Sequence, residues 1–268
     1  MPTVSSTPAS TEYSNERFRF GLRSIFVVFA LVAAAILLIR SIVDWSEHRR
    51  VVREQAAIRE ACKSAFKIVA ITIRLNDERR QLAWPPEVPL DANGKPLNSW
   101  RFQLYRTFAV PDVDFPYPHD PMAPWNAPAN KQQVGDDQMP FCFANRPRST
   151  TTYIFGIAGS DTAFDAKAVD RLSALPSTTV VMMEVADSKT HWMQPGDYDV
   201  AELLAATGRL GDTVKGVLPD RVHVLFADGE VWALSPDMPI DALKPFLKIS
   251  TAKAADREKL LSGYRADE

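Results

Sequence analysis

The segment SIFVVFALVAAAILLIRSIV, residues 24–43, decides the architecture that the sequence predicts. Its only charged side chain is Arg40, and a helix of this length, at about 1.5 Å per residue, matches the roughly 30 Å hydrocarbon core of a bilayer. Such a helix satisfies its own backbone and exposes apolar side chains on all sides, which suits lipid and not water. We therefore predict a transmembrane helix over residues 24–43.

Two other interpretations of this segment stay open. A buried core helix would need other long apolar elements around it, and the chain has no second long apolar run. A cleaved signal peptide would need a clear small-x-small site before Trp45, and the segment is rather long for a signal peptide.

The residues at the ends of the span are those expected at a membrane interface. Arg23 precedes it, Arg40 lies near its end, where a long side chain can reach the headgroups, and Trp45 carries an amphipathic ring. The lysines and arginines within about 20 residues of each end slightly favour a cytoplasmic C-terminal side.

The chain around the span divides into an N-terminal tail and a stalk. Residues 1–23 are rich in Ser and Thr without apolar periodicity, which predicts a disordered tail. Residues 44–83 contain no Gly or Pro, which predicts that the helix continues as an amphipathic stalk until Pro85 and Pro86 end it. Spacings of three and four residues place one apolar stripe on this stalk: Ile58, Cys62, Phe66, Val69 and Ile73.

The remainder, residues 84–250, is predicted to form one soluble domain with a loop-rich part (84–150) and a sheet (151–235). Ser99 can cap a short helix in the loop-rich part. The β-branched and aromatic runs that predict strands are residues 151–158, 178–185, 221–226 and 230–234. Asp228 and Gly229 lie between the last two runs and predict a hairpin turn.

Residues 240–249 and 252–261 predict short closing helices, the second within a C-terminal helix and tail over 251–268. The fold class is therefore α+β: a transmembrane helix continues into a long stalk helix that packs on a small antiparallel sheet, as in a pilin.

Composition and motifs argue against catalysis and nucleic-acid binding. The net charge of −2 gives no basic field for nucleic acid, and we find no phosphate-binding loop, zinc-binding helix or nucleophile elbow. Glu184 with Asp187 could form a carboxylate pair, but solvated loop charges are the simpler interpretation. A calcium site is conceivable in one polar, proline-rich loop: Asp112, Asp114, His119 and Asp120. We predict no catalytic, cofactor or metal site.

Cys62 and Cys142 form a possible disulfide if the domain lies outside the cytoplasm. Closing a loop of that length would contribute about 4 to 5 kcal/mol in the chain-entropy model. Two unpaired, small hydrophobic residues remain the equal alternative.

Several motifs in one order resemble a bacterial family of membrane-anchored, pilin-like proteins called domain of unknown function 1559, which is associated with prepilin-type processing. They are REQAAIREACKSAFKIVAITIRLND, PLDANGKPLNSWRFQLY, APWNAPANKQ, MPFCF, STTVVMMEVAD, HWMQPGD and VHVLFADGEVWALS. The resemblance covers most of residues 50–250. It implies a pilin-like fold and a soluble part that faces away from the cytoplasm, opposite to the charge count.

The chain departs from the pattern of that family at two places. Arg19 to Leu22 resemble a degenerate prepilin signal, but Phe26 stands where the family has a Glu, which argues against cleavage at Gly21 and for an uncleaved anchor. Leu218 stands where the family commonly has a His before its Asp-Gly pair, here Asp228 and Gly229.

The sequence thus predicts a single-pass protein of the bacterial inner membrane with an extracytoplasmic domain. Its expected partners are membrane lipid and an envelope or secretion-system protein, and its expected role is structural or in assembly. A tethered binding module for an envelope glycan or protein, using Trp125, Tyr117 and loop carboxylates, is the alternative, and an undetected hydrolase is the third reading.

Overall fold

The structure is a computed structural model that describes residues 22–79, 83–108, 120, 122–131, 141, 150–165 and 167–266. The chain forms two compact units, Met1–Arg53 and Glu54–Glu268. Helix α1 (Leu22–Arg79) begins in the first unit and ends in the second. Of the tail predicted over residues 1–23, only the last two residues are described, and they belong to α1.

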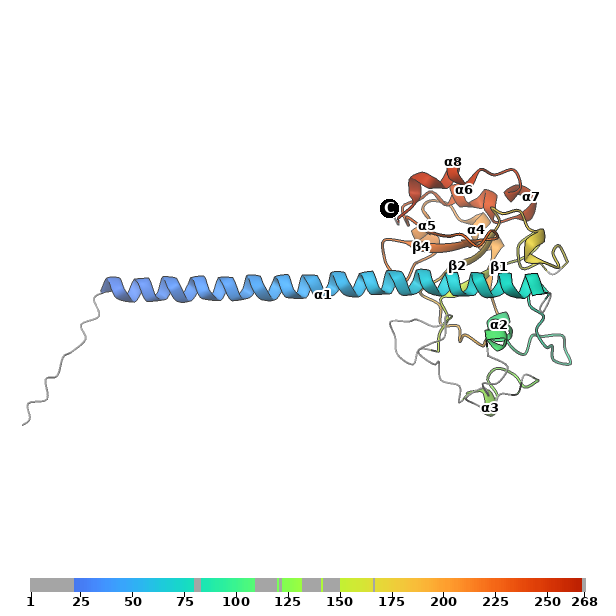
Figure 1. Ribbon diagram of the computed structural model, residues 1–268, viewed down its shortest axis with the longest axis horizontal. Coiled ribbons are helices and arrows are strands. Elements are labelled where there is room, and N and C mark those ends of the chain that lie inside the picture. Colours follow the sequence, from blue (N-terminus) through green and yellow to red (C-terminus); the bar gives the residue numbers. More distant parts are fainter. Residues whose placement is uncertain are drawn as a thin grey trace, which may run out of the picture. The chain divides into compact units, whose positions relative to one another are not determined.

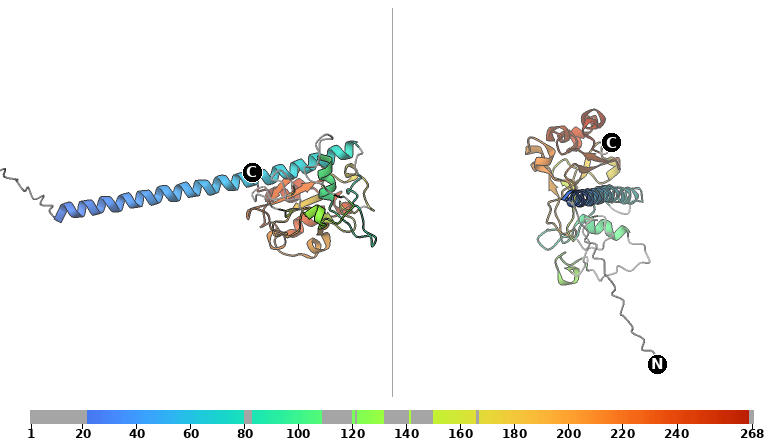
Figure 2. Two further views of the ribbon diagram at one scale, coloured as in Figure 1. Left: turned by 90° about the horizontal axis from the view of Figure 1, so that it is seen from below. Right: turned by 90° about the vertical axis from the view of Figure 1, so that its left-hand side faces the viewer.

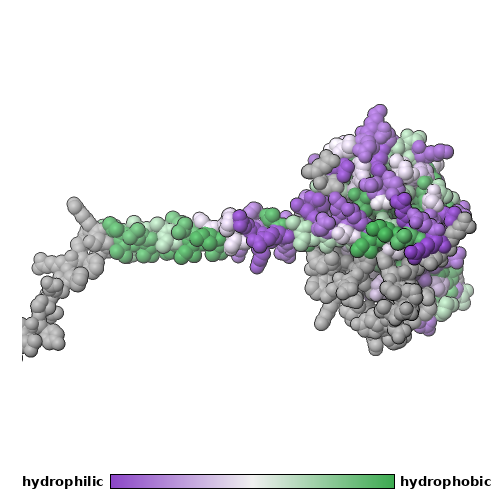
Figure 3. Space-filling view, viewed as in Figure 1, coloured by the Kyte–Doolittle hydropathy of each residue, from purple (hydrophilic) through white to green (hydrophobic). Residues whose placement is uncertain are grey.

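The first unit holds an apolar helix whose surface is unburied. Among the described helices, one is long and apolar enough to cross a membrane, and none of its most apolar window is buried. Figure 3 shows this part of α1 as a continuous apolar surface. The interpretation as a buried core helix is therefore wrong, whereas a single-pass anchor or a signal sequence fits. Trp45 is exposed, and the Arg49 guanidinium lies 3.8 Å from the centre of its ring.

The second unit is built on a five-stranded sheet in the order β3-β1-β2-β4-β5. The strands are β1 (Ile154–Ala158), β2 (Val180–Glu184), β3 (Tyr198–Asp199), β4 (Val222–Phe226) and β5 (Val231–Leu234). Neighbours pair antiparallel except β1 and β3, which are parallel. The predicted α+β, pilin-like arrangement is confirmed, but the sheet is mixed because the Asp197 carboxylate accepts the Gly156 N–H and holds β3 alongside β1.

Both faces of the sheet are covered. The predicted stripe of α1 packs on one face, where Cys62, Phe66, Val69 and Ile73 are buried in a cluster with sheet residues such as Leu225. A second cluster fills the other face, under short helices that Figure 1 shows on the side of the sheet away from α1. Figure 2 shows α1 and the strands side by side in this unit. Because both faces are buried, the strands read as nearly continuous apolar runs.

The helices of that second layer are short. They are α4 (Val200–Ala205), α5 (Leu210–Thr213), α6 (Ile240–Leu243), α7 (Ile249–Ala252) and α8 (Arg257–Leu261), with 3-10 turns η2 (Lys244–Phe246) and η3 (Ser262–Tyr264). The closing helices predicted over 240–249 and 252–261 therefore exist as shorter pieces, because Pro245 interrupts the first. The sequence did not predict α4 and α5.

The loop-rich part carries α2 (Trp100–Phe108) and α3 (Pro128–Lys131), and the 3-10 turn η1 (Leu172–Ala174) lies between β1 and β2. The predicted cap of α2 is present, since the Ser99 hydroxyl accepts the Phe102 N–H at 3.2 Å.

Candidate functional site: a cationic pocket between α1 and the sheet

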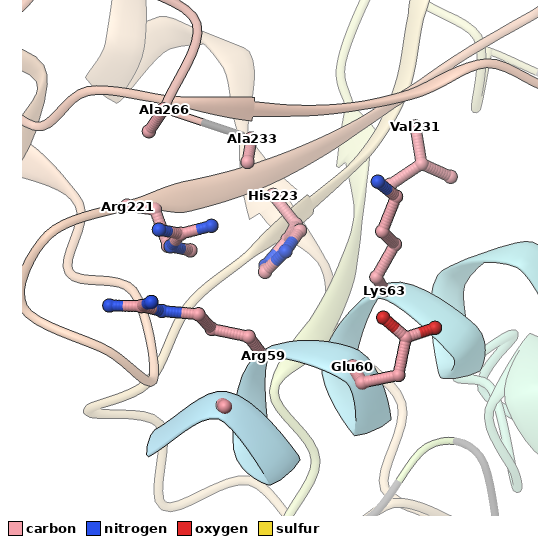
Figure 4. Close-up of a pocket in the computed structure, with 9 residues that line it drawn as sticks. Arg59, Glu60, Lys63, Arg221, His223, Val231, Ala233 and Ala266 are labelled. Atoms are coloured by element: carbon pink, nitrogen blue, oxygen red, sulfur yellow. The ribbon is translucent and has the colours of Figure 1, made fainter. Parts of the chain in front are cut away.

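A pocket of about 400 Å³ lies between α1 and the edge of the sheet formed by β4 and β5. Figure 4 shows its residues, which come from about two turns of α1, from β4 and the residue before it, from β5 and from the chain after η3. They are Ala56, Arg59, Glu60, Lys63, Arg221, His223, Val231, Ala233 and Ala266. Three side chains in this set are permanently cationic and one is acidic, so the lining is positive.

Asp220 holds two of the arginines at one end of the pocket. Its carboxylate accepts the Arg59 guanidinium at 2.9 Å and the Arg221 guanidinium at 3.0 Å. The hydrogen bond from Arg221, with the charges of Arg221 and Arg59, keeps the pKa of Asp220 below its usual value. The single negative charge of Asp220 thus positions two guanidinium groups, whose two positive charges exceed it.

A buried histidine forms the floor of the pocket. His223 lies on β4, and its Nδ1 is 2.7 Å from the Glu184 carboxylate on β2. The same carboxylate accepts the backbone N–H groups of His223 and Val217. Because Glu184 occupies Nδ1, the nitrogen of His223 that remains for a ligand is Nε2. The ring points into the pocket in Figure 4.

The described lining of the pocket holds no hydroxyl or thiol side chain. Among the described residues that line it, none is Ser, Thr, Tyr or Cys. Cys62 lies nearby on α1, but burial raises the pKa of its thiol to about 12, so the thiol stays protonated at neutral pH. The arrangement can bind and orient an anion.

Glu184 corrects an interpretation made from the sequence. We expected Glu184 and Asp187 to be solvated loop charges, yet Glu184 is fully buried and satisfied by His223 and Val217. Asp187 is exposed and pairs with Lys215 at 3.2 Å. The two carboxylates therefore have different partners. No local pattern in the sequence predicts that His223 lies opposite Glu184.

Asp228 and Gly229 form the predicted hairpin turn between β4 and β5. Gly229 has a φ of +88°, and the Asp228 carboxylate accepts the Glu230 N–H at 3.0 Å. Asp228 also pairs with Arg257 of α8 at 2.8 Å, a contact that the sequence did not predict. This pair ties the hairpin to the layer of short helices.

Two of the motifs quoted for the family resemblance, PLDANGKPLNSWRFQLY and HWMQPGD, meet in a buried network. The Asp197 carboxylate of HWMQPGD accepts Trp100 Nε1 at 2.8 Å, Arg101 at 3.0 Å and the Gly156 N–H at 2.9 Å. The Ser99 hydroxyl of the NSWR stretch donates to the Trp192 carbonyl at 2.7 Å. These residues join α2 to β1 and to the start of β3, so their role here is structural.

The loop motif APWNAPANKQ also has a structural role. The side chain of Asn130 is buried and donates to three backbone carbonyls, which folds the loop around Trp125. The ring of Trp125 stacks on His191 with centroids 5.2 Å apart, and burial lowers the pKa of His191 to about 4.

Other predicted site residues lie outside the described part of the chain. Tyr117, Asp112, Asp114 and His119 are among them, so the conceivable calcium site stays untested, although no group of three or more metal-ligating side chains occurs among the described residues. Cys142 is also outside it. Cys62 is buried as a free thiol, and the bridge stays a prediction.

Comparison with protein-family models, with curated proteins and with solved structures finds no match for this chain. The resemblance to the pilin-like family therefore remains a hypothesis based on the motifs, and the fold defines the protein only as an α+β domain on an apolar N-terminal helix.

Proposed function

We propose that this protein is a membrane-anchored, non-enzymatic, pilin-like component of a bacterial cell-envelope, secretion or pilus-type system. The span of α1 would hold it in the inner membrane, and the unit Glu54–Glu268 would lie outside the cytoplasm. Its role would be structural or in assembly, with membrane lipid and an envelope protein as partners.

One observation carries the proposal: a single helix supplies both an unburied apolar segment and the stripe that packs on the sheet. The side chains of Phe26, Phe29 and Leu31 are each 65% exposed or more. An apolar helix with no protein cover is stable in lipid and not in water. The same helix includes Phe66 and Val69, both fully buried in the second unit.

A tethered binding module is the second candidate, and the pocket between α1 and the sheet favours it. A positive, partly enclosed pocket suits recognition, and the two functions are compatible in one chain. A hydrolase has weaker support, because the described lining of the pocket holds no Ser, Thr or Cys nucleophile paired with a base.

The proposal is tested by protease accessibility of the full chain in intact cells and in spheroplasts, with the mass of the N-terminal peptide measured in parallel. We expect the second unit to be cleaved in spheroplasts and the N-terminus to retain residues before Phe26. Protection of the second unit in spheroplasts would overturn the orientation. A mature chain that starts after Val43 would overturn the anchor and favour a signal sequence.

Extraction in a mild detergent tests the role itself. Co-purification of an envelope or secretion-system complex supports the assembly role. A chain that is recovered alone but binds a ligand saturably supports the second candidate instead.

A further inference from the structure

We propose that the pocket between α1 and the β4–β5 edge binds a tetrahedral oxyanion, the phosphate group of inorganic phosphate or of a phospholipid headgroup. The inference concerns the second unit alone and goes beyond the proposed function, so it can fail while the membrane anchor stands.

The electrostatics of the pocket favour an anion. Arg59, Lys63 and Arg221 contribute three positive charges, against which Glu60 in the lining and Asp220 at its end supply two negative ones. The Arg221 side chain is only 11% exposed, so much of its charge is removed from bulk water. A charge in such a place is screened weakly, and an anion at the pocket would add to the compensation that Asp220 already provides.

Donor geometry favours an anion with several oxygens. Arg59 Nε is buried and has no hydrogen-bond partner, although a terminal nitrogen of the same guanidinium binds Asp220. Figure 4 shows the Arg59 and Arg221 guanidinium groups at one end of the pocket with the His223 ring beside them. These groups come from the helix and from the strand, so they approach a bound group from different directions.

A phosphate satisfies this set better than a carboxylate does. The two oxygens of a carboxylate suit one guanidinium fork, and Asp220 already provides such a group. A phosphate offers further acceptor oxygens, which can meet Arg59 from α1 and Arg221, next to the start of β4, together. Apolar side chains complete the walls, namely Ala56, Val231 and Ala233, which leaves room for the organic part of a phosphate ester.

The test measures binding of inorganic phosphate and of dioctanoyl phosphatidic acid to the full chain in detergent micelles by isothermal titration calorimetry. We expect saturable binding with one site per chain. Tighter binding of phosphatidic acid than of phosphate would identify the headgroup as the source, and equal affinity would identify free phosphate.

Matched variants on one helix locate the site. Arg59→Gln removes the buried Nε donor and should weaken binding at least about tenfold, the usual effect of a charge-assisted hydrogen bond. Arg74→Gln is the control, because Arg74 is exposed on α1, pairs with Glu78 at 3.4 Å and is not part of the pocket. Its affinity should equal that of the wild type.

Three results would overturn the proposal: no saturable binding to the wild-type chain, equal losses in both variants, or displacement of phosphate by an acidic peptide that binds more tightly. Since Asp267 and Glu268 follow Ala266 in the sequence, the titration is repeated with D267N/E268Q. We expect this variant to bind phosphate at least as tightly as the wild-type chain does. Weaker binding by the variant would also contradict a site for external anions.

Discussion

At the scale of single residues, Asp197 illustrates how a motif residue can be structural. Its carboxylate lies among Trp100, Arg101 and the backbone of β1, and burial raises its pKa while the Arg101 charge opposes that shift. Arg101 is fully buried, so its charge depends on this neighbour. Breaking a buried ion pair by removing one partner is strongly destabilising.

We therefore expect Asp197→Asn to lower the free energy of unfolding by about 3 to 5 kcal/mol. Asp187→Asn is the matched control, because its pair with Lys215 is exposed and should contribute less than about 1 kcal/mol. Urea unfolding of the full chain in micelles, followed by tryptophan fluorescence, measures both values. Equal effects of the two variants would show that the Asp197 network does not stabilise the fold.

His191 gives a prediction about pH. Burial lowers its pKa from 6.5 to about 4, so between these values the unfolded chain binds a proton that the folded chain does not. Stability is therefore full above about pH 6.5 and falls as the pH drops toward 4. The whole shift corresponds to about 3 kcal/mol, and we expect about half of it because the ring is partly solvated.

The measurement compares unfolding free energies at pH 7 and pH 4.5 for the wild type and for His191→Phe. The variant keeps an aromatic ring against Trp125 and lacks the titrating group. Its loss of stability on acidification should be smaller than that of the wild type by the His191 contribution. An identical loss in both chains would contradict the prediction.

Cys62 gives a chemical prediction. Since burial raises the pKa of its thiol to about 12, we expect iodoacetamide to label Cys62 in the native chain very slowly even at pH 9, as measured on the peptide that contains Cys62. Labelling of that peptide after denaturation without reductant identifies a free thiol, whereas labelling only after reduction identifies a bridge to Cys142. Rapid labelling of Cys62 in the native chain at pH 9 would contradict its burial.

At the scale of elements, the turn that contains Gly216 packs against the backbone of Arg221, which lines the pocket. A Cβ atom at Gly216 would overlap the Arg221 carbonyl oxygen, and the next residue, Val217, donates its N–H to Glu184 at 2.7 Å. The turn therefore supports both the arginine and the carboxylate that orients His223.

We expect Gly216→Ala to destabilise the fold by at least about 2 kcal/mol, because backbone rather than a flexible side chain must move. Gly263→Ala is the control, since a Cβ there meets no atom within 4 Å and its φ is not positive. Thermal unfolding in micelles compares them. A melting temperature of Gly216→Ala equal to that of Gly263→Ala would refute the proposed close contact.

The elements that could be predicted from the sequence have either a long run of periodic apolar residues or a short motif that specifies a turn. The stripe from Ile58 to Ile73 fixes α1 through helical spacing, and Asp228 with Gly229 fixes the hairpin through positive φ. β3, of two residues, was missed because the Asp197 contact and not its own composition places it beside β1. α4 and α5 were not predicted because each has fewer than two full helical turns, too few for an apolar periodicity to be recognised.

The site could not be predicted because its residues meet only in the folded chain. Arg59 and Asp220 are 161 positions apart, and Glu184 and His223 are 39 apart. In the sequence, each of these four residues resembles an ordinary surface charge or strand residue. No local pattern marks them, so the pocket depends on how α1 is placed on the sheet.

At the scale of the whole molecule, the question is whether the apolar part of α1 stays in lipid. An arginine near the centre of a span costs about 2.5 to 3.5 kcal/mol on insertion scales, so two cost about 5 to 7 kcal/mol. Leu31 and Leu38, which are 65% and 64% exposed, offer suitable positions within residues 24–43.

We expect the wild-type chain to remain in the membrane pellet after alkaline carbonate extraction and the double variant L31R/L38R to appear in the supernatant or be degraded. I68R/I71R is the control, since Ile68 and Ile71 are exposed apolar residues of the same helix but lie in the second unit. The control should stay in the pellet, because it leaves the span unchanged. If the wild type is released, or if both double variants behave alike, hydrophobicity of residues 24–43 is not what retains the chain, and the anchor on which the proposed function rests is wrong.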